Sequence, residues 1–113
     1  MTYTLDYLEF SSGDGQGSQK FFAEAFGWSM TSYGPEYAAI DDAGIGVGIH
    51  SAAERVAEPL AVIQTTDLKK AYTDVVGAGG VITKEPYDFP GGRRFHFREP
   101  GGNELAVWTQ AAE

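Results

Sequence analysis

Apolar residues recur along this chain with two different periods, and the change from one to the other marks its secondary structure. Residues 14–26 and 67–78 carry apolar side chains at the spacing of one helix face. The first stripe consists of Phe21, Phe22, Ala25 and Phe26, and the second of Leu68, Ala71, Tyr72, Val75 and Val76. The pattern predicts two helices of about three turns each.

Each predicted helix has a start and a stop signal. Asp14 and Asp67 stand where an N-cap side chain accepts a hydrogen bond from the first turn. Gly27 follows the first stripe, where a left-handed C-cap belongs, and Gly79-Gly80 follows the second. Asp14 precedes Gly27 by 13 residues and Asp67 precedes Gly80 by 13 residues, which indicates an internal duplication.

Short strand-like runs fill the rest of the chain, separated by many of its 15 glycines and 5 prolines. One run precedes each helix and three follow it, so the order is βαβββ twice. The runs are residues 3–11, 28–33, 36–41 and 44–50, then residues 59–65, 81–87, 93–98 and 104–109. We expect a single domain of two repeated modules, about 1–50 and 59–113. The tether over 51–58 forms either a helical turn or a solvated linker.

Three motifs, in their order and spacing, resemble the vicinal oxygen chelate superfamily of glyoxalase I, bleomycin resistance proteins and extradiol dioxygenases. They are Asp14 with Phe21-Phe22 and Phe26-Gly27-Trp28, Asp67 with Ala78-Gly79-Gly80, and Glu99-Pro100-Gly101-Gly102-Asn103. The last is similar to the family's Asp-Pro-x-Gly-Asn turn, with Glu in place of Asp. The resemblance implies an α+β fold whose two βαβββ modules form a curved, partly open β-barrel with the helices outside. It also implies a ligand cavity inside the barrel and a homodimer.

Metal enzymes of this superfamily draw one ligand, usually His, Gln or Glu, from each of four strands. The resemblance places three of these positions at Tyr7, Leu60 and Ala106, and the fourth within the glycine-rich run 44–48. None of these side chains is a usual metal ligand. We therefore expect neither a metal nor another cofactor.

Alternation along the strands assigns their side chains to two faces. The residues expected to pack against the helices are Leu8, Phe10, Ile63, Phe95, Phe97, Leu105 and Val107. The residues expected to line the ligand cavity are Tyr7, Glu9, Leu60, Val62, His96, Ala106 and Trp108. Trp108 offers a large surface for stacking against a planar ligand, whereas Trp28 is expected in the core.

Two polar side chains on the cavity face each have two interpretations. Glu9 lies in an otherwise apolar strand, where an unpaired buried charge is expensive. It either serves a function or forms a salt bridge with an arginine. His96 either binds a ligand or moves a proton, or it is a structural histidine bonded to Glu9 or Glu104.

Other positions lead to more specific expectations. Glu104 is expected to pair with Arg94 or Arg98, and His50, at a strand end, is expected to be exposed to solvent. Gly44, Gly46 and Gly48 alternate with apolar residues, so one face of that strand has no side chains. This predicts the close approach of another backbone or a ligand, and in a dimer the neighbour would be the partner chain.

Composition excludes several classes of function. A net charge of −8 disfavours nucleic acid and anionic membranes as partners, but it is compatible with a neutral or cationic small molecule. The alternative is that the acidic charge only keeps the protein soluble. The absence of cysteine excludes disulfides and thiolate zinc sites. The start of the chain lacks a signal-peptide pattern and no apolar run is long enough to span a membrane, so we expect a cytoplasmic protein.

These observations lead to a first hypothesis and two alternatives. The first is a homodimeric protein that binds a small, aromatic or cationic molecule in the barrel cavity without the usual metal. The second is a glyoxalase-like or dioxygenase-like enzyme, a lyase or isomerase, with a relocated metal or acid/base site at Glu9, His96 and Glu104. The third is an accessory subunit with a vestigial cavity.

Overall fold

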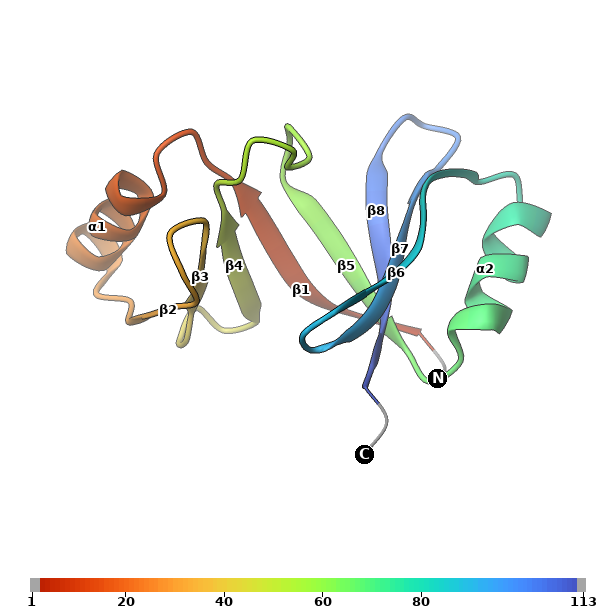
Figure 1. Ribbon diagram of the computed structural model, residues 1–113, viewed down its shortest axis with the longest axis horizontal. Helices are drawn as coiled ribbons and strands as arrows, with labels where there is room; N and C mark the ends of the chain where they lie inside the picture. The colour runs from red at the N-terminus through yellow and green to blue at the C-terminus, as the bar shows by residue number, and fades with distance from the viewer. Residues whose placement is uncertain (1–2, 112–113) are drawn as a thin grey trace. The chain divides into compact units, whose positions relative to one another are not determined.

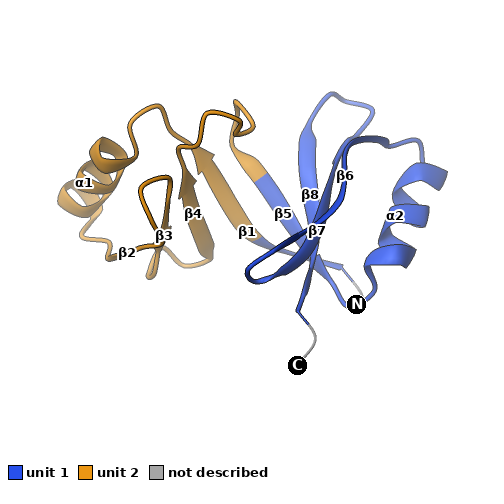
Figure 2. Ribbon diagram, viewed as in Figure 1, with its two compact units in different colours: residues 1–6, 61–113 blue, residues 7–60 orange. Residues whose placement is uncertain are grey.

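The computed structural model describes residues 3–111, which fall into two compact units (Figure 1, Figure 2). Unit 2 comprises Tyr7–Leu60, and unit 1 comprises the residues up to Asp6 together with those from Ala61 onward. The strand β1 (Tyr3–Ser11) therefore contributes residues to both units. Each unit is described below by itself.

The two units repeat one topology. Unit 2 holds most of β1, then α1 (Gly15–Phe26), β2 (Met30–Ser32), β3 (Tyr37–Ile40) and β4 (Gly46–His50). Unit 1 holds most of β5 (Leu60–Thr65), then α2 (Leu68–Gly77), β6 (Val81–Phe89), β7 (Gly92–Arg98) and β8 (Glu104–Gln110). The strand orders are β2-β3-β4-β1 and β5-β8-β7-β6, with β1–β4 and β5–β8 parallel and the other pairs antiparallel. The predicted α+β class and the repeated βαβββ order are confirmed.

Both helices begin at the predicted N-caps; α1 ends at the predicted glycine, and α2 ends at Gly77 with Ala78 as its C-cap, just before the predicted stop at Gly79-Gly80. The Asp14 carboxylate accepts a hydrogen bond from the Gly17 N–H at 3.0 Å, and Asp67 accepts one from the Lys70 N–H at 3.0 Å. Gly27 has a φ of 71°, the left-handed conformation that favours glycine, and it ends α1. The helix boundaries follow from these local interactions, which is why the sequence pattern located them.

Each helix covers a core formed by alternate strand residues. In unit 2 the Phe10 and Phe22 rings stack with centroids 5.5 Å apart, and Trp28 packs against the same core, as expected. In unit 1 the buried side chains Ala71, Phe95, Phe97 and Val107 form the core, with Ile63 and Leu105 packed against it. The alternate positions of the strands lie on the opposite faces. The helix-facing positions are thereby confirmed for Phe10, Ile63, Phe95, Phe97, Leu105 and Val107.

The strand β6 is longer and less regular than expected. It continues to Phe89, and its pairing with β7 shifts register between Ile82 and Lys84 and again between Lys84 and Tyr87. The second shift spans Pro86, which cannot donate a ladder hydrogen bond and is tolerated because β6 lies at the end of the strand order. As a result Lys84 and Tyr87, three residues apart, lie opposite His96 and Arg94 and share one face.

The tether is anchored to unit 2 by the Arg55 side chain, although four of its eight residues are exposed to solvent. Arg55 donates from Nε to the Ser11 hydroxyl at 2.8 Å and from Nη1 to the Ala52 carbonyl at 3.0 Å. Ala52 itself is buried. The segment contains one hydrogen-bonded turn, from the Arg55 N–H to the Ala52 carbonyl at 3.2 Å, but no helix, so it matches neither the helical turn nor the plain solvated linker in full.

Candidate functional site

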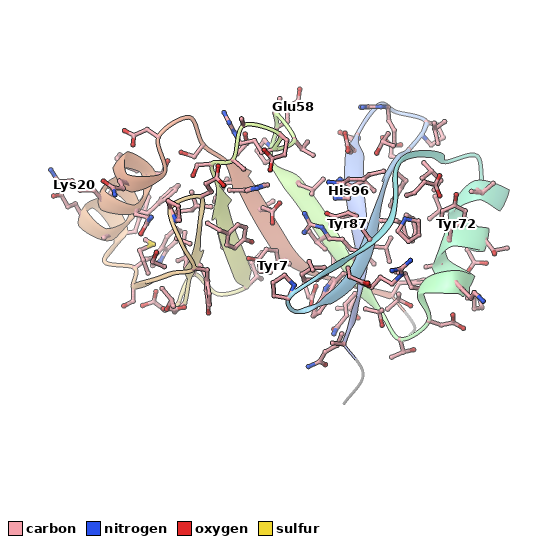
Figure 3. All side chains as sticks on the ribbon, in the orientation of Figure 1. Tyr7, Lys20, Glu58, Tyr72, Tyr87 and His96 are labelled. Atoms are coloured by element: carbon pink, nitrogen blue, oxygen red, sulfur yellow. The ribbon has the colours of Figure 1, made fainter. Side chains whose placement is uncertain are left out.

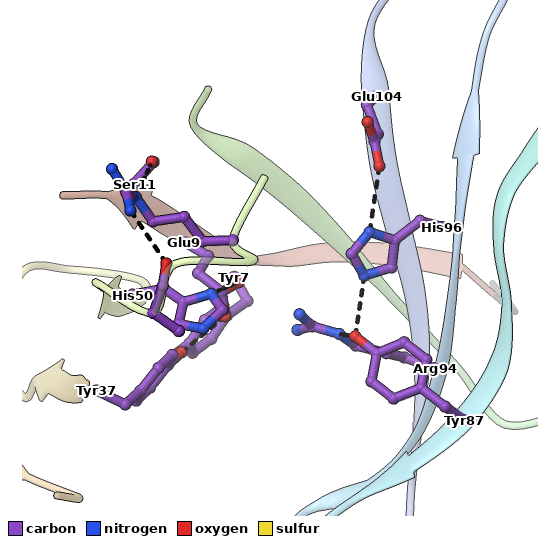
Figure 4. Close-up of polar contacts among 11 residues, drawn as sticks. Tyr7, Glu9, Ser11, Tyr37, His50, Tyr87, Arg94, His96 and Glu104 are labelled. Carbon is purple, nitrogen blue, oxygen red and sulfur yellow. Dashed lines mark hydrogen bonds and ion pairs between the residues drawn. The ribbon is translucent and has the colours of Figure 1, made fainter. Parts of the chain in front are cut away.

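In each unit the strand face opposite the helix carries a chain of polar side chains. The side chains Tyr87 and His96 belong to this face of unit 1, whereas Tyr72 projects from α2 on the other side of the sheet (Figure 3). Figure 4 shows the polar contacts of both units. Charged and hydrogen-bonding groups gathered on one face of a sheet are where binding and chemistry are expected.

The polar chain of unit 1 runs from Glu104 through His96 to Tyr87 (Figure 4). His96 Nδ1 lies 3.3 Å from Glu104 Oε2, and His96 Nε2 lies 3.0 Å from the Tyr87 hydroxyl oxygen. The chain continues to Arg94, whose Nε donates to the Tyr87 oxygen at 2.5 Å. The three strands β6, β7 and β8 thus each supply part of one continuous network.

The direction of every hydrogen bond in this chain is fixed by its ends. A carboxylate only accepts, so neutral His96 carries its proton on Nδ1 and donates it to Glu104. Its Nε2 is then an acceptor, and Tyr87 must donate its hydroxyl proton there. Arg94 only donates, which agrees with Tyr87 oxygen as its acceptor. The network is therefore a directional relay from Arg94 to Glu104.

His96 stays neutral at physiological pH because of its surroundings. Only 3% of it is exposed, and this burial, followed by the positive charge of Arg94, holds the pKa of His96 below its ordinary value. The hydrogen bond and charge of Glu104 oppose the shift, and the charge of Lys84 adds to it. Because the Nε2 atom of neutral His96 accepts the hydrogen bond from the Tyr87 hydroxyl, this imidazole can take up a proton from that hydroxyl.

Two cations lie beside the Tyr87 ring. The Lys84 ammonium is 4.3 Å from the ring centroid, and the Arg94 guanidinium carbon is 5.7 Å from it. Arg94 also lies 5.6 Å from the centroid of Phe89. Both side chains therefore place positive charge beside Tyr87, where it would stabilise negative charge on a neighbouring group.

Trp108 continues this face as an aromatic surface. Its ring lies 6.2 Å from that of Phe89, and it is opposite Arg94 in the β7–β8 pairing. Its indole Nε1 donates to the Asp6 carboxylate at 3.1 Å, which fixes the ring orientation. The helix-opposite position predicted for Trp108 and His96 is confirmed by this pairing, since both alternate with the core residue Val107 and its partner Phe95.

Unit 2 has its own polar chain, which ends on Glu9 (Figure 4). Tyr37 donates to Glu9 Oε2 at 2.9 Å, so the Tyr7 hydroxyl, 2.5 Å from that of Tyr37, must donate to the Tyr37 oxygen. Burial, then the Glu9 charge and the Tyr7 hydrogen bond, raise the pKa of Tyr37 well above its ordinary range. Tyr7 and Glu9 lie opposite the helix face of β1, as predicted.

The expectation for His50 was wrong. His50 is half-buried, with its Nδ1 3.6 Å from Glu9 Oε1 and its ring 5.7 Å from that of Tyr37. The cause is the strand register, which pairs His50 with Ser11 in β1 and with Tyr37 in β3 and so places it on the Glu9 face. In contrast, the predicted partner of Glu104 is confirmed, because Arg98 Nη2 lies 3.4 Å from Glu104 Oε1.

The glycine-rich run also differs from its expectation. A Cβ atom at Gly48 would overlap the hydroxyl groups of Tyr37 and Tyr7, so the close neighbour is a pair of tyrosine side chains of this unit rather than another backbone. Gly44 precedes β4 and has a φ of 102°, which belongs to a turn. The bare face of β4 therefore makes room for the tyrosines at position 48.

The remaining predicted cavity residues are apolar and fully packed. Leu60, Val62 and Ala106 are 1%, 2% and 0% exposed, and Val62 is opposite Ala106 in the β5–β8 pairing. Tyr7 and Glu9 belong to unit 2 and His96 and Trp108 to unit 1, so their convergence on one pocket stays a prediction. Whether a ligand reaches Leu60, Val62 or Ala106 also stays a prediction.

The residues at the superfamily's metal positions do not fit a divalent ion. Leu60 and Ala106 have no donor atom, and the Tyr7 hydroxyl is engaged with Tyr37. Within residues 3–111, no three His, Cys, Asp or Glu side chains lie together as a metal site requires. The same stretch contains no helix long and apolar enough to cross a membrane.

Sequence reasoning did not single out Tyr87 and Tyr37, which both complete these networks. The face of Tyr87 depends on the register shift in β6, and Pro86 beside it was the available signal. For Tyr37 the available signal was Gly48, a strand position without a side chain in an apolar run.

Comparison with solved structures finds the same fold at low sequence identity. The NAD-dependent benzaldehyde dehydrogenase of Legionella pneumophila superimposes with a TM-score of 0.78 at 13% identity, covering 93% of this chain and 98% of that chain. A glyoxalase/bleomycin resistance protein/dioxygenase superfamily member from Vibrio splendidus 12B01 gives 0.74 at 18%, covering 95% and 100%. Methylmalonyl-CoA epimerase from Mycobacterium tuberculosis gives 0.72 at 14%, covering 96% and 88%.

Comparison of the sequence itself gives the family. A search of curated proteins finds no match. The family model of the glyoxalase/bleomycin resistance protein/dioxygenase superfamily matches residues 4–107, which is nearly the whole chain. With the repeated βαβββ fold and the structural likenesses above, this match shows that the chain belongs to the glyoxalase/bleomycin resistance protein/dioxygenase superfamily.

Proposed function

We propose that this protein binds a small aromatic molecule on the helix-opposite face of unit 1, without the metal ion that enzymes of its superfamily use. The observation that carries the proposal is the half-buried aromatic surface of Trp108 and Phe89, with the Arg94 guanidinium over the Phe89 ring. Planar rings fixed in orientation beside a few polar groups are the usual anatomy of a small-molecule site.

The charge of the chain bears on the kind of ligand. With a net charge of −8, the protein attracts a cation and repels an anion at long range. Within unit 1, however, Arg94 and Lys84 bring positive charge to the binding face. A neutral planar molecule is therefore the class that this face suits best, and a cationic ligand, which the net charge attracts, is the second.

The experiment uses three ligands of one shape: neutral indole, cationic tryptamine and anionic indole-3-acetate. Binding is measured by calorimetry and by the shift of the thermal unfolding midpoint. We expect indole to bind, and Trp108→Ala to weaken its affinity by about three- to tenfold, the range for one aromatic stacking contact. Tyr33→Ala, at a side chain 67% exposed in unit 2, is the matched control and should leave the affinity unchanged. Binding that is equal in wild type and Trp108→Ala would place the ligand elsewhere.

A further inference from the structure

The relay of unit 1 includes the Tyr87 hydroxyl oxygen, which lies on the helix-opposite face where the ligand is proposed to bind. We propose that Tyr87 and His96 form a metal-independent acid–base site. In it the Tyr87 oxygen takes a proton from an acidic C–H group of a bound planar ligand while the Tyr87 proton passes to His96 Nε2. This inference rests on the proposed function, because the ligand must first lie on the same face.

The geometry determines which atom meets the ligand. His96 is 3% exposed and both of its ring nitrogens are engaged, one with Glu104 and one with Tyr87. Tyr87 is only half-buried, and its oxygen already accepts from Arg94 and donates to His96. A phenolic oxygen has a second lone pair, so Tyr87 can accept one proton as it passes on its own.

The step balances without a cofactor. The ligand C–H bond breaks, and its proton bonds to the Tyr87 oxygen. The Tyr87 O–H bond breaks in concert, and an N–H bond forms at His96 Nε2, which gives an imidazolium beside the Glu104 carboxylate. The electron pair of the C–H bond stays on the ligand as negative charge. The reverse movement returns a proton to the ligand or to water, and no electron is exchanged with an oxidant or reductant.

The charges around the relay favour both products of this step. Glu104, 3.3 Å from His96 Nδ1, stabilises the imidazolium. The Lys84 ammonium, 4.3 Å from the Tyr87 ring centroid, and the Arg94 guanidinium, 5.7 Å from it, stabilise an anion formed on the ligand.

The groups facing His96 make its role testable by pH. Lys84 faces it from β6, Arg94 from its own strand β7 and Glu104 from β8. Neutral His96 is the proton acceptor, so the rate should rise with pH and level off above the pKa of His96. The midpoint of this rise in rate reports the pKa of His96. Removing Glu104 should move the midpoint to lower pH and removing Lys84 should move it to higher pH, because the Glu104 charge raises the pKa of His96 and the Lys84 charge lowers it.

The probe is 5-nitrobenzisoxazole, a planar carbon acid. Loss of its C3 proton breaks the ring N–O bond and forms a nitrile, and the electron pair ends on a coloured phenolate. Binding is measured separately with 5-nitroindazole, which has the same shape and cannot open. We expect the wild type to bind 5-nitroindazole and to release phenolate from the probe above the buffer rate.

Four variants and one control test the assignment. Tyr87→Phe and His96→Gln should each lower the protein-dependent rate by about 100-fold, the size of a general acid–base contribution, while 5-nitroindazole still binds. Glu104→Gln and Lys84→Met should shift the midpoint of the pH profile in opposite directions. Tyr72→Phe is the matched control and should keep the rate, since that hydroxyl bonds Glu85 at the other side of the sheet.

Each outcome decides one of the two proposals. If 5-nitroindazole binds but the probe is not turned over, or if Tyr87→Phe reacts as fast as wild type, the acid–base site is wrong and the binding function stands. If neither indole nor 5-nitroindazole binds, the binding function fails and the acid–base site fails with it. If His96→Gln does not fold, the Tyr87→Phe rate and the two pH shifts still give the answer.

Discussion

The Tyr37 hydroxyl group occupies the space that a side chain at Gly48 would need. Gly48 lies opposite Glu9 in the β1–β4 pairing, and Tyr37 reaches across it to donate to the Glu9 carboxylate at 2.9 Å. Tyr37 can reach Glu9 only because position 48 has no side chain. This contact keeps Glu9, which is only 6% exposed, hydrogen-bonded. An unpaired carboxylate at that depth would be expensive.

Gly48→Ala should therefore destabilise the protein by about 1–3 kcal/mol, the usual cost of inserting a methyl group into filled space. Urea denaturation gives this free energy. Gly77→Ala is the matched control, because a Cβ atom there meets nothing within 4 Å and α2 gains a better helix former, so it should be neutral or stabilising.

The double variant Gly48→Ala/Tyr37→Phe identifies the cause of this loss. Removing the Tyr37 hydroxyl relieves the closest of the overlaps that the new Cβ atom makes, although the Tyr7 hydroxyl still crowds it, so the two changes together should cost less than their sum. Strict additivity of the two free energies would mean that the tyrosine hydroxyl is not what excludes a side chain at Gly48.

His96 should make stability depend on pH in a defined direction. Its pKa in the folded protein is lowered from 6.5 by burial and by Arg94, so the unfolded chain takes up the proton first as the pH falls. The contribution is fully present above the unfolded value and is lost as the pH falls from about 7 through the folded pKa. Denaturation at a series of pH values should show this loss in the wild type and a flatter profile in His96→Gln. Equal slopes for the two proteins would contradict it.

Glu9 should select for the charge of any ligand that contacts its carboxylate. Tryptamine should then bind more tightly than indole-3-acetate, which has nearly the same shape. Glu9→Gln should weaken tryptamine by about 1–3 kcal/mol, the size of a desolvated hydrogen bond to a charge, and leave indole unchanged. Calorimetry measures all three. An equal effect of Glu9→Gln on the cation and the neutral ligand would indicate a structural role alone.

The protein should bind no divalent metal in stoichiometric amount. Leu60 and Ala106 have no donor atom, and the Tyr7 hydroxyl is committed to Tyr37. Elemental analysis of protein purified without chelator, followed by titration with nickel, zinc, manganese and ferrous ions, measures this. One tightly held ion per chain, lost in Glu9→Gln or His96→Ala, would instead establish the relocated metal site.

The chain should form a two-fold homodimer, as the resemblance to its superfamily implies. A specific interface of this kind buries more than about 1,200 Å² in total. Light scattering at micromolar concentration should then give twice the chain mass of 12.2 kDa. A mass near that of one chain would contradict the prediction.

The sequence by itself determined the local structure and the family. Asp14, Asp67 and Gly27 set helix ends through contacts within a few residues, and the period of two assigned Phe10, Val107 and Trp108 to their faces. Such signals are readable because cause and effect lie close together in the chain. The spacing of the repeated motifs gave the superfamily in the same way.

Only the tertiary structure decided which polar groups meet. Tyr37 and His50 contact Glu9 because the register among three strands, distant in sequence, places them on one face. Tyr87 meets His96 because β6 shifts register across Pro86, and a shift reverses the face that simple alternation assigns. Strand register is set by the packing of whole faces rather than by neighbouring residues. The elements were therefore predictable from the sequence, and the His96–Glu104 bond was one of two interpretations, whereas the link from His96 to Tyr87 was not foreseen.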